Sequence, residues 1–266
     1  ISGQYGRYVC VDAPAGKYVF SSSTMYATDC AIGTYQAATG QSSCDTADAG
    51  YYVNSSLGIA QTNQTACLTG TYNPYTGSTN SSVCVVADAG YYVNSSLGIA
   101  QTSQTACLAG TYNPNTGSTN SSVCGAANAG YYVLSIGQSN QTACSAGTYQ
   151  ALTGQIACDD ADAGYFVGIT GQPSQTECAI GTYQSLTGQV ACDNADAGYY
   201  VAQTTQTTQV GCAIGTYQAL TGQGSCDDAD AGYYVSLLAG SAQTTQTACL
   251  AGTYNPDIGS ANSSAC

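Results

Sequence analysis

One short motif constrains the fold of this chain more than any other feature. The motif is Cys-x-x-Gly-Thr-Tyr, and a second cysteine lies 14 or 17 positions after the first one. An example is Cys178-Ala-Ile-Gly-Thr-Tyr183, which is followed by Cys192. Between these loops lies a second motif, Ala-Asp-Ala-Gly-Tyr-Tyr-Val in its commonest form. The two motifs together recur seven times, which predicts a tandem array. The cysteine loops span 30–44, 67–84, 107–124, 144–158, 178–192, 212–226 and 249–266.

The cysteines are numerous and evenly spaced, and large apolar residues are scarce. The 266 residues include 15 Cys and 32 Gly, but no Trp, two Phe and one Met. Regular cysteine spacing indicates an oxidising compartment and a disulfide framework. Each unit is expected to bury one or two tyrosine rings, a valine and its disulfide. A bridge that closes a loop of this size stabilises a fold by roughly 3 kcal/mol.

The spacing of the cysteines divides the chain into units of two lengths. A connector of 23 positions is always followed by a loop of 17, and a connector of 20 by a loop of 14. Duplication of a cassette explains this coupling, since 45–84 and 85–124 differ at only five positions. Contact between the two three-residue insertions is the other explanation. The predicted divisions are a degenerate unit 1–29, a loop module 30–44, and repeats 45–84, 85–124, 125–158, 159–192, 193–226 and 227–266.

The local pattern favours short strands over helices. Apolar residues do not recur at helical spacing, whereas Tyr-Tyr-Val triplets such as 51–53 follow a glycine, and this composition is typical of strands that begin after a tight turn. We expect strands of three to five residues and almost no helix. The predicted fold is small, disulfide-rich and mostly β or irregular, built as an elongated rod of tandem repeats. Each Gly-Thr-Tyr tyrosine is expected to pack on the next tyrosine pair; a carbohydrate-binding strip of tyrosines is the alternative.

The charge balance excludes some partners. Arg7 and Lys17 are the only basic residues, against 15 acidic ones, so the net charge is −13. Nucleic-acid binding requires Lys and Arg and is excluded, and binding to anionic lipid is disfavoured. No apolar run approaches 18 residues, so this segment is not expected to insert into a membrane. Ile1 does not open a signal-peptide pattern; we expect that a signal has been removed or that the sequence is a window of a longer array.

The sequence lacks the usual inventory of catalytic and metal-binding residues. It has no His, so His-based triads and His metal ligands do not arise. Paired carboxylates occur at 159–160 and 227–228, beside cysteines, and are expected to be solvated turns. Asp159, Asp160 and Asp162 form an acidic cluster, but no calcium-loop pattern surrounds them. We therefore expect no catalytic residue, no metal and no cofactor, and the chain is predicted not to be an enzyme.

The chemical signal that does recur is the N-glycosylation sequon. In a secreted protein this motif marks surface asparagines that accept sugar, and threonine-rich connectors such as 204–208 offer O-linked sites as well. The array is therefore expected to be an extracellular glycoprotein, secreted or on the cell surface. The sequon asparagines are Asn54, Asn63, Asn80, Asn94, Asn120, Asn140 and Asn262.

Cysteine followed by x-x-Gly-Thr-Tyr, with a second cysteine about 14 residues later, resembles the cysteine-rich repeat of ephrin-receptor-like ectodomains. It is also similar to the first loop module of tumour necrosis factor receptors. The resemblance covers nearly the whole chain and implies that the first cysteine of each loop bonds to the next. Cys10 would then pair with an upstream segment or another chain. A competing register, Cys10–Cys30 and Cys44–Cys67 and onward, would leave Cys266 unpaired. The implied pairs are Cys30–Cys44, Cys67–Cys84, Cys107–Cys124, Cys144–Cys158, Cys178–Cys192, Cys212–Cys226 and Cys249–Cys266.

The chain departs from that family at positions where a further cysteine is expected. Because these positions hold other residues, each unit is expected to keep one disulfide, and no irregular charged loop is present to form a receptor-type ligand surface. The residues concerned are Ala47, Ala87, Ala127, Ala161, Ala195 and Ala229, together with Gln64, Gln104 and Gln141.

These features predict a structural subunit or segment of an extracellular, glycosylated fibre or cell-surface appendage. Its expected partners are copies of itself, in head-to-tail or filament assembly, and covalent glycans. The alternative is an adhesion or receptor ectodomain in which the array is a stalk that binds protein or carbohydrate. A third hypothesis, ice or sugar binding by regular Thr or Tyr rows, requires even spacing, which the two unit lengths disfavour.

Overall fold

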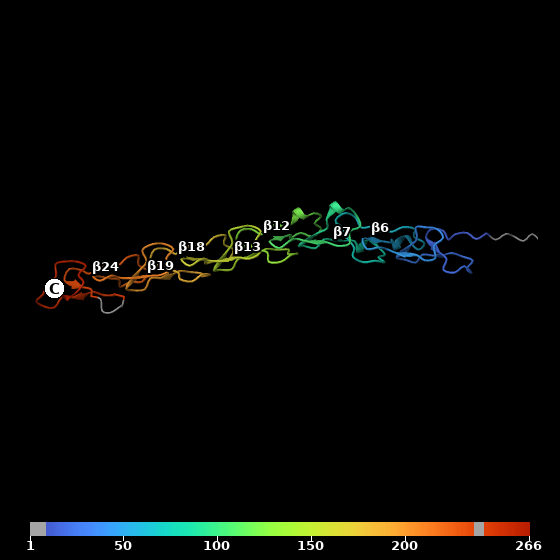
Figure 1. Cartoon of the computed structure of the whole chain (residues 1–266). Coiled ribbons are helices and arrows are strands. Elements are labelled where there is room, and N and C mark those ends of the chain that lie inside the picture. Colours follow the sequence, from blue (N-terminus) through green and yellow to red (C-terminus); the bar gives the residue numbers. More distant parts are fainter. Residues whose placement is uncertain (1–8, 237–241) are drawn as a thin grey trace, which may run out of the picture. The chain divides into compact units, whose positions relative to one another are not determined.

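The computed structural model describes residues 9–236 and 242–266, which fold into a succession of very short hairpins (Figure 1). Turns of 3₁₀ helix, each three residues long, lie in some of the loops: η1 (Ser55–Leu57), η2 (Ser81–Val83), η3 (Ser95–Leu97), η4 (Ser121–Val123) and η5 (Ser263–Ala265). The strands are β1 (Lys17–Tyr18), β2 (Thr28–Asp29), β3 (Thr34–Tyr35), β4 (Asp45–Thr46), β5 (Tyr51–Tyr52), β6 (Thr65–Ala66), β7 (Thr71–Tyr72), β8 (Val85–Val86), β9 (Tyr91–Tyr92), β10 (Thr105–Ala106), β11 (Thr111–Tyr112), β12 (Gly125–Ala126), β13 (Tyr131–Tyr132), β14 (Thr142–Ala143), β15 (Thr148–Tyr149), β16 (Asp159–Asp160), β17 (Tyr165–Phe166), β18 (Thr176–Glu177), β19 (Thr182–Tyr183), β20 (Asp193–Asn194), β21 (Tyr199–Tyr200), β22 (Val210–Gly211), β23 (Thr216–Tyr217), β24 (Asp227–Asp228), β25 (Tyr233–Tyr234) and β26 (Thr247–Ala248).

Both sequence motifs build the same hairpin. In 47–66, which we call an alanine half-repeat, β5 pairs antiparallel with β6. In 67–86, a cysteine half-repeat, β7 pairs with β8 in the same register relative to the preceding glycine. Gly50 and Gly70 hold equivalent positions and have φ of 84° and 86°, a region that favours glycine. The chain therefore alternates two versions of one unit, named by the buried residue that begins each version.

The chain divides into two compact units. One consists of Ile1–Gly125 with Ser135–Asn140, and the other of Ala126–Leu134 with Gln141–Cys266. Within each unit the half-repeats contact one another through a recurring set of backbone hydrogen bonds.

The first set of contacts joins each half-repeat to the next one. The Ala47 carbonyl accepts the Gly77 N–H at 2.7 Å, and the Cys67 carbonyl accepts the Ala100 N–H at 3.0 Å. The same bonds occur in the second unit, for example from Gly188 N–H to the Ala161 carbonyl. Because the backbone supplies these bonds, they recur whatever the side chains of the loops.

The second set of contacts skips one half-repeat. A Cβ atom placed on Gly50 would lie 2.2 Å from the Ala100 carbonyl oxygen, and one on Gly181 would lie 2.2 Å from the Gly222 carbonyl oxygen. Such distances require glycine at each of these positions. At these positions half-repeats of the same kind are stacked backbone against backbone, whereas at Gly70 the neighbouring atom is the Thr119 methyl carbon, at 2.8 Å.

The buried core is made of small residues. In the repeats from 45–84 to 193–226 the alanine, the valine that follows the tyrosine pair and the first cysteine are buried, for example Ala47, Val53 and Cys67 at 0–1% exposed. The strand tyrosines are half-buried, apart from the exposed Tyr233, so the expected core of tyrosine rings is wrong. A two-stranded hairpin has no second layer over its outer face, which leaves one side of each ring in contact with water.

The predicted fold class is confirmed: the described residues are β or irregular, carry seven disulfides and contain only 3₁₀ turns as helix. The predicted strand length of three to five residues is wrong, since every strand has two residues. The reason lies in the residue after the strand. The Val53 N–H donates to the Ser78 carbonyl of the next half-repeat at 2.8 Å, so it is not available to extend the hairpin.

Candidate functional site

The longer loops of two adjoining half-repeats meet in space. In the 45–84 repeat the Ser55 N–H donates to the Thr79 carbonyl at 2.8 Å, and in the next repeat Ser95 and Thr119 do the same. Both partners lie in the segments that hold the three-residue insertions. The structure thus supports the contact explanation for the coupling of a long connector with a long loop, while the near-identity of 45–84 and 85–124 remains a mark of duplication.

Sequon asparagines flank this contact. Asn54 directly precedes Ser55, and Asn80 directly follows Thr79. Each begins a 3₁₀ turn, and its side-chain oxygen accepts the N–H of the serine two residues later, at 3.1 Å in η1 and 3.0 Å in η2. The hydroxyl of that same serine also donates to the asparagine oxygen. This geometry recurs at Asn94, Asn120 and Asn262.

These caps leave the glycan-accepting atom available. The serine N–H and hydroxyl both use the Oδ1 atom of Asn80, and among the described residues no acceptor is paired with its Nδ2. Asn80, Asn120 and Asn262 are exposed, and Asn54 and Asn94 are half-buried. A sugar on Nδ2 is therefore compatible with the folded turn.

The other two sequons have a different setting. Asn63 and Asn140 are exposed, and each is followed by a glutamine whose side chain is engaged elsewhere. Gln64 Oε1 accepts the Asp48 N–H at 2.7 Å, and Gln141 Oε1 accepts the Asn128 N–H at 2.7 Å. The hydroxyl residue that completes each of these sequons lies in a hairpin strand, β6 or β14. The structure thus separates the seven predicted asparagines into five in 3₁₀ caps and two beside hairpins.

The seven cysteine pairs that the resemblance implies are brought together, and the competing register is absent from the structure. The paired Cα atoms lie 5.4–5.8 Å apart, and the closed loops have 14 or 17 positions. Cys10 is exposed and has no disulfide partner among the described residues. Six of the pairs tie the start of a cysteine half-repeat to the residue just before the second strand of its hairpin, and the seventh, Cys249–Cys266, closes a loop that ends in η5.

The alanine half-repeats replace this bridge with hydrogen bonds. By the shared hairpin register, Ala47 and Gln64 take the positions of Cys67 and Cys84. Gln64 accepts the Asp48 N–H through Oε1 and donates through Nε2 to Asp48 Oδ2, both at 2.7 Å. We call this pair an Asp–Gln clamp. The further clamps are Asp88–Gln104, Asp162–Gln175, Asp196–Gln209 and Asp230–Gln246, and Asn128–Gln141 keeps the backbone bond alone.

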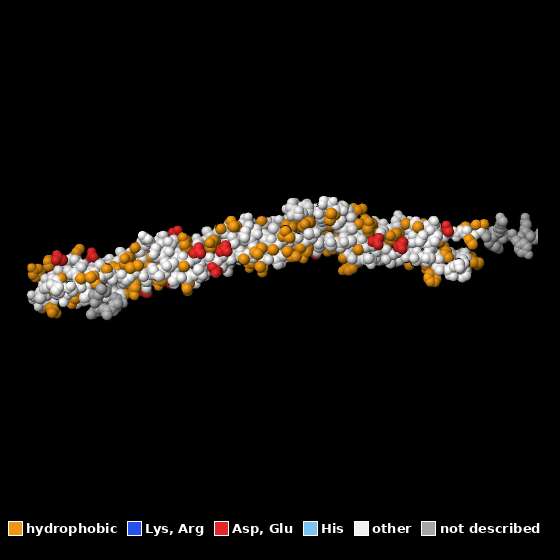
Figure 2. Space-filling model, in the orientation of Figure 1, with side chains coloured by type: hydrophobic (Ala, Val, Ile, Leu, Met, Phe, Trp, Pro, Cys, Tyr) orange, Lys and Arg blue, Asp and Glu red, His pale blue; other side chains and the backbone are white. Residues whose placement is uncertain are grey.

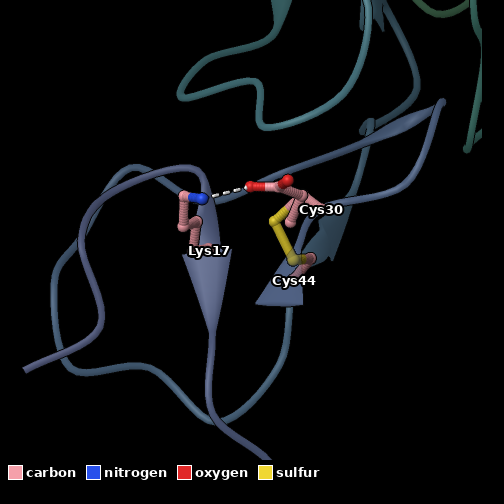
Figure 3. A network of polar contacts seen from close by, with 4 residues as sticks. Lys17, Cys30 and Cys44 are labelled. Carbon is pink, nitrogen blue, oxygen red and sulfur yellow. Dashed lines mark ion pairs between the residues drawn. A yellow bond between two sulfur atoms is a disulfide. The ribbon is translucent and has the colours of Figure 1, made fainter. Parts of the chain in front are cut away.

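The first half-repeat carries a different cross-link. Pro14 and Ala27 stand where the clamp residues are expected, and a proline has no N–H to donate. Here Lys17 Nζ lies 2.7 Å from Asp29 Oδ1, across the β1–β2 hairpin. Figure 3 shows this ion pair beside the Cys30–Cys44 disulfide.

A buried amide completes each cysteine half-repeat and was missed by sequence reasoning. In loops of 17 it is an asparagine: Asn73 is 0% exposed and donates to the Tyr51 carbonyl at 2.9 Å and to Ser78 Oγ at 3.0 Å. In loops of 14 it is a glutamine: Gln36 donates to the Ser43 carbonyl at 3.0 Å. The residue after Gly-Thr-Tyr changes with loop length, and this covariation was the available signal.

Burial alters the acidity of three Gly-Thr-Tyr tyrosines. Desolvation raises the pKa of Tyr35, Tyr72 and Tyr149 above the ordinary 10.0, and a nearby aspartate adds to the effect in each case. The aspartates are Asp48, Asp88 and Asp162 respectively, so the clamp residues also face these rings. The partial burial of these tyrosines fits packing against neighbours better than a free strip.

Potential metal ligands are dispersed over residues 9–236 and 242–266. No group of three or more potential ligands gathers there, and the exposed Asp159 accepts a hydrogen bond from Gln150. The surface in Figure 2 carries scattered apolar side chains and small groups of acidic ones. Within the described part of the chain, no helix has the length and apolar character needed to cross a bilayer.

No known family model matches the chain, and no curated protein sequence matches it. The likeness to ephrin-receptor and tumour necrosis factor receptor modules therefore holds at the level of a tandem cysteine-rich array of disulfide-linked hairpins.

Proposed function

We propose that this chain is a structural subunit, or a segment of one, in an extracellular glycosylated fibre or cell-surface appendage. The observation that carries the proposal is the backbone stacking of like half-repeats. The Ala100 carbonyl oxygen packs closely against Gly50, and the Gly222 carbonyl oxygen packs against Gly181 in the same way. A contact that uses backbone atoms can be repeated any number of times, which suits a material built by addition of equal parts.

The location is argued from the cysteines. Seven disulfides in small loops persist in an oxidising environment and are reduced in most cytosols. Five sequon asparagines lie in caps that leave Nδ2 available, which fits a glycan coat on a secreted or surface-exposed protein. Copies of the same chain are the proposed partners, through stacking of a half-repeat of one copy on that of another.

Electron microscopy of the native material, with peptide mass spectrometry, tests this proposal. We expect long polymers with the spacing of the repeats, and hexosamine on peptides that contain Asn80 or Asn120. Isolated single molecules with no polymer in the native source would contradict the fibre. A membrane span or a binding head in the same mature chain would favour the stalk of an adhesion or receptor ectodomain instead.

A further inference from the structure

A shallow groove lies beside the disulfide of the 67–84 loop. It has a volume of about 250 Å³ and is lined by Tyr52, Leu68, Thr71 and Ser81 together with the two sulfur-bonded cysteines. A groove of about 310 Å³ occupies the equivalent place beside Cys30–Cys44, with Tyr18 and Ala31 in the positions of Tyr52 and Leu68. The hairpin and its disulfide therefore create such a groove in both loop types.

What distinguishes the long loop is an exposed leucine. Leu68 is 74% exposed although it lines the groove. All three loops of 17 carry leucine at this position, whereas the loops of 14 carry the smaller Ala31, Ser145, Ala179 and Ala213. Covering an exposed leucine lowers the free energy by about 25 cal/mol per Å² of apolar surface buried. A large, exposed apolar side chain at this position is therefore a feature of the long loops alone.

The sequon occurs in the same loops. In every loop of 17 an asparagine directly precedes the serine that lines the groove or its equivalent: Asn80, Asn120 and Asn262. The Tyr, Leu, Thr and Ser of the groove are also the same in all three copies, while the loop position occupied by Tyr75 changes to Asn115 and Asp257. Variation between the copies therefore falls outside the groove and the sequon.

The chemistry of the groove suits a sugar ring. A tyrosine ring and a leucine offer an apolar wall, and the hydroxyls of Thr71 and Ser81 stand beside it. An N-acetylhexosamine has an apolar face of ring C–H groups and an edge of hydroxyl and acetamide groups, so it matches both parts. Asn80 directly precedes Ser81, which lines the groove. Because Nδ2 of Asn80 is available, a sugar attached to it begins at the rim of the groove.

We propose that the groove of each 17-residue loop seats the first N-acetylhexosamine of a glycan on the preceding asparagine, with Leu68 and Tyr52 under the sugar ring at Asn80. This inference rests on the proposed function, because it requires that the chain be glycosylated. It assigns the glycan a structural role: the sugar covers an exposed leucine at a position where the short loops carry alanine or serine.

Nuclear Overhauser spectroscopy on the glycosylated chain, trimmed to a single N-acetylhexosamine at each site, tests the seat. We expect cross-peaks between the sugar protons and both the Leu68 methyls and the Tyr52 ring, with equivalents in the other long loops. Leu68→Ala should weaken the contacts of the sugar with Tyr52 while mass spectrometry still finds the sugar on Asn80. Because Leu68 is exposed, this variant is expected to fold.

The groove beside Cys30–Cys44 is the matched control, since no sequon precedes it, and Tyr18 should show no sugar contacts. An occupied Asn80 whose sugar shows no contact with Leu68 or Tyr52 would overturn the seat and leave the glycan coat standing. Unmodified Asn80, Asn120 and Asn262 in the native protein would overturn the seat, and unmodified asparagines at all seven sequons would overturn the glycan coat as well.

Discussion

The carbonyl oxygen of Ala100 lies 2.2 Å from the place where a Cβ atom on Gly50 would be. Gly50 has a φ of 84°, and Ala100 has a φ of 62° although it is not a glycine. Ala100 thus adopts a disfavoured conformation while its N–H donates to the Cys67 carbonyl and its carbonyl meets Gly50. Two residues 50 positions apart are fitted to each other at the backbone level.

Replacement of Gly50 by alanine tests this stacking. The new methyl group would overlap backbone atoms, so we expect a loss of about 1–3 kcal/mol beyond the cost of the positive φ itself. Hydrogen exchange of the Ala100 amide, whose bond closes the contact, reports the local opening free energy. The control is Gly77→Ala, because Gly77 has a φ of 67° and open space around its Cβ. Equal exchange in the two variants would contradict the contact.

The equivalence of the two half-repeats predicts a new disulfide. Ala47 and Gln64 occupy the positions of Cys67 and Cys84, and both pairs are 17 positions apart. We therefore expect Ala47→Cys with Gln64→Cys to oxidise spontaneously and to raise stability by roughly 3 kcal/mol, less the lost clamp bonds. Intact-mass spectrometry after thiol alkylation shows whether the disulfide has formed. The parent already has the exposed, unpaired Cys10, so each single variant should show one reactive thiol more than the parent. A double variant with two reactive thiols more than the parent would refute the equivalence.

The buried amide of Asn73 is expected to matter more than its size suggests. Asn73→Ala removes the donor to the Tyr51 carbonyl and the acceptor for the Tyr75 N–H. Groups left unpaired in a buried place cost about 1–3 kcal/mol each, so urea unfolding should shift to clearly lower concentration. Asn115→Ala, at an exposed side chain, is the comparison and should stay within about 0.5 kcal/mol of the parent. A similar midpoint for both variants would argue against the network.

Alkaline pH should destabilise the array through its tyrosines. The folded-state pKa of Tyr35, Tyr72 and Tyr149 is raised above 10.0 by desolvation and then by nearby aspartates. Between pH 10 and the raised pKa the unfolded chain has lost protons that the folded chain retains, so the free energy of unfolding falls as pH rises there. Below pH 10 this contribution is fully present. The measurement is the thermal unfolding temperature across this pH range, which should depend less on pH in Tyr72→Phe than in the parent. An unchanged pH dependence in both Tyr72→Phe and Tyr149→Phe would contradict the tyrosine contribution.

Much of this architecture could be predicted from sequence because its signals are local. The Gly-Thr-Tyr and Gly-Tyr-Tyr motifs predict a turn followed by a strand, and the resemblance to receptor-type cysteine-rich repeats implied the loop pairs. The comparison with receptor-type repeats placed Gln64 where a cysteine was expected, but the clamp itself was not predicted, because a glutamine clamp and a disulfide share no chemistry. The equal separations 47–64 and 67–84 were the signal for it. Contacts such as Ser55 with Thr79 depend on how one half-repeat stacks on the next, and the coupled lengths of connector and loop left such a contact as one of two explanations. The tyrosines were assigned to the core from their size, but small residues fill the space between such close backbones.

The central claim is that each repeat is held by its own disulfide between neighbouring cysteines. Mass mapping of the mature, unreduced protein tests it most directly. We expect linked peptides for Cys67–Cys84 and Cys178–Cys192 and their five equivalents. Reduced thiols at these positions, or linked peptides that join Cys44 to Cys67, would contradict the account.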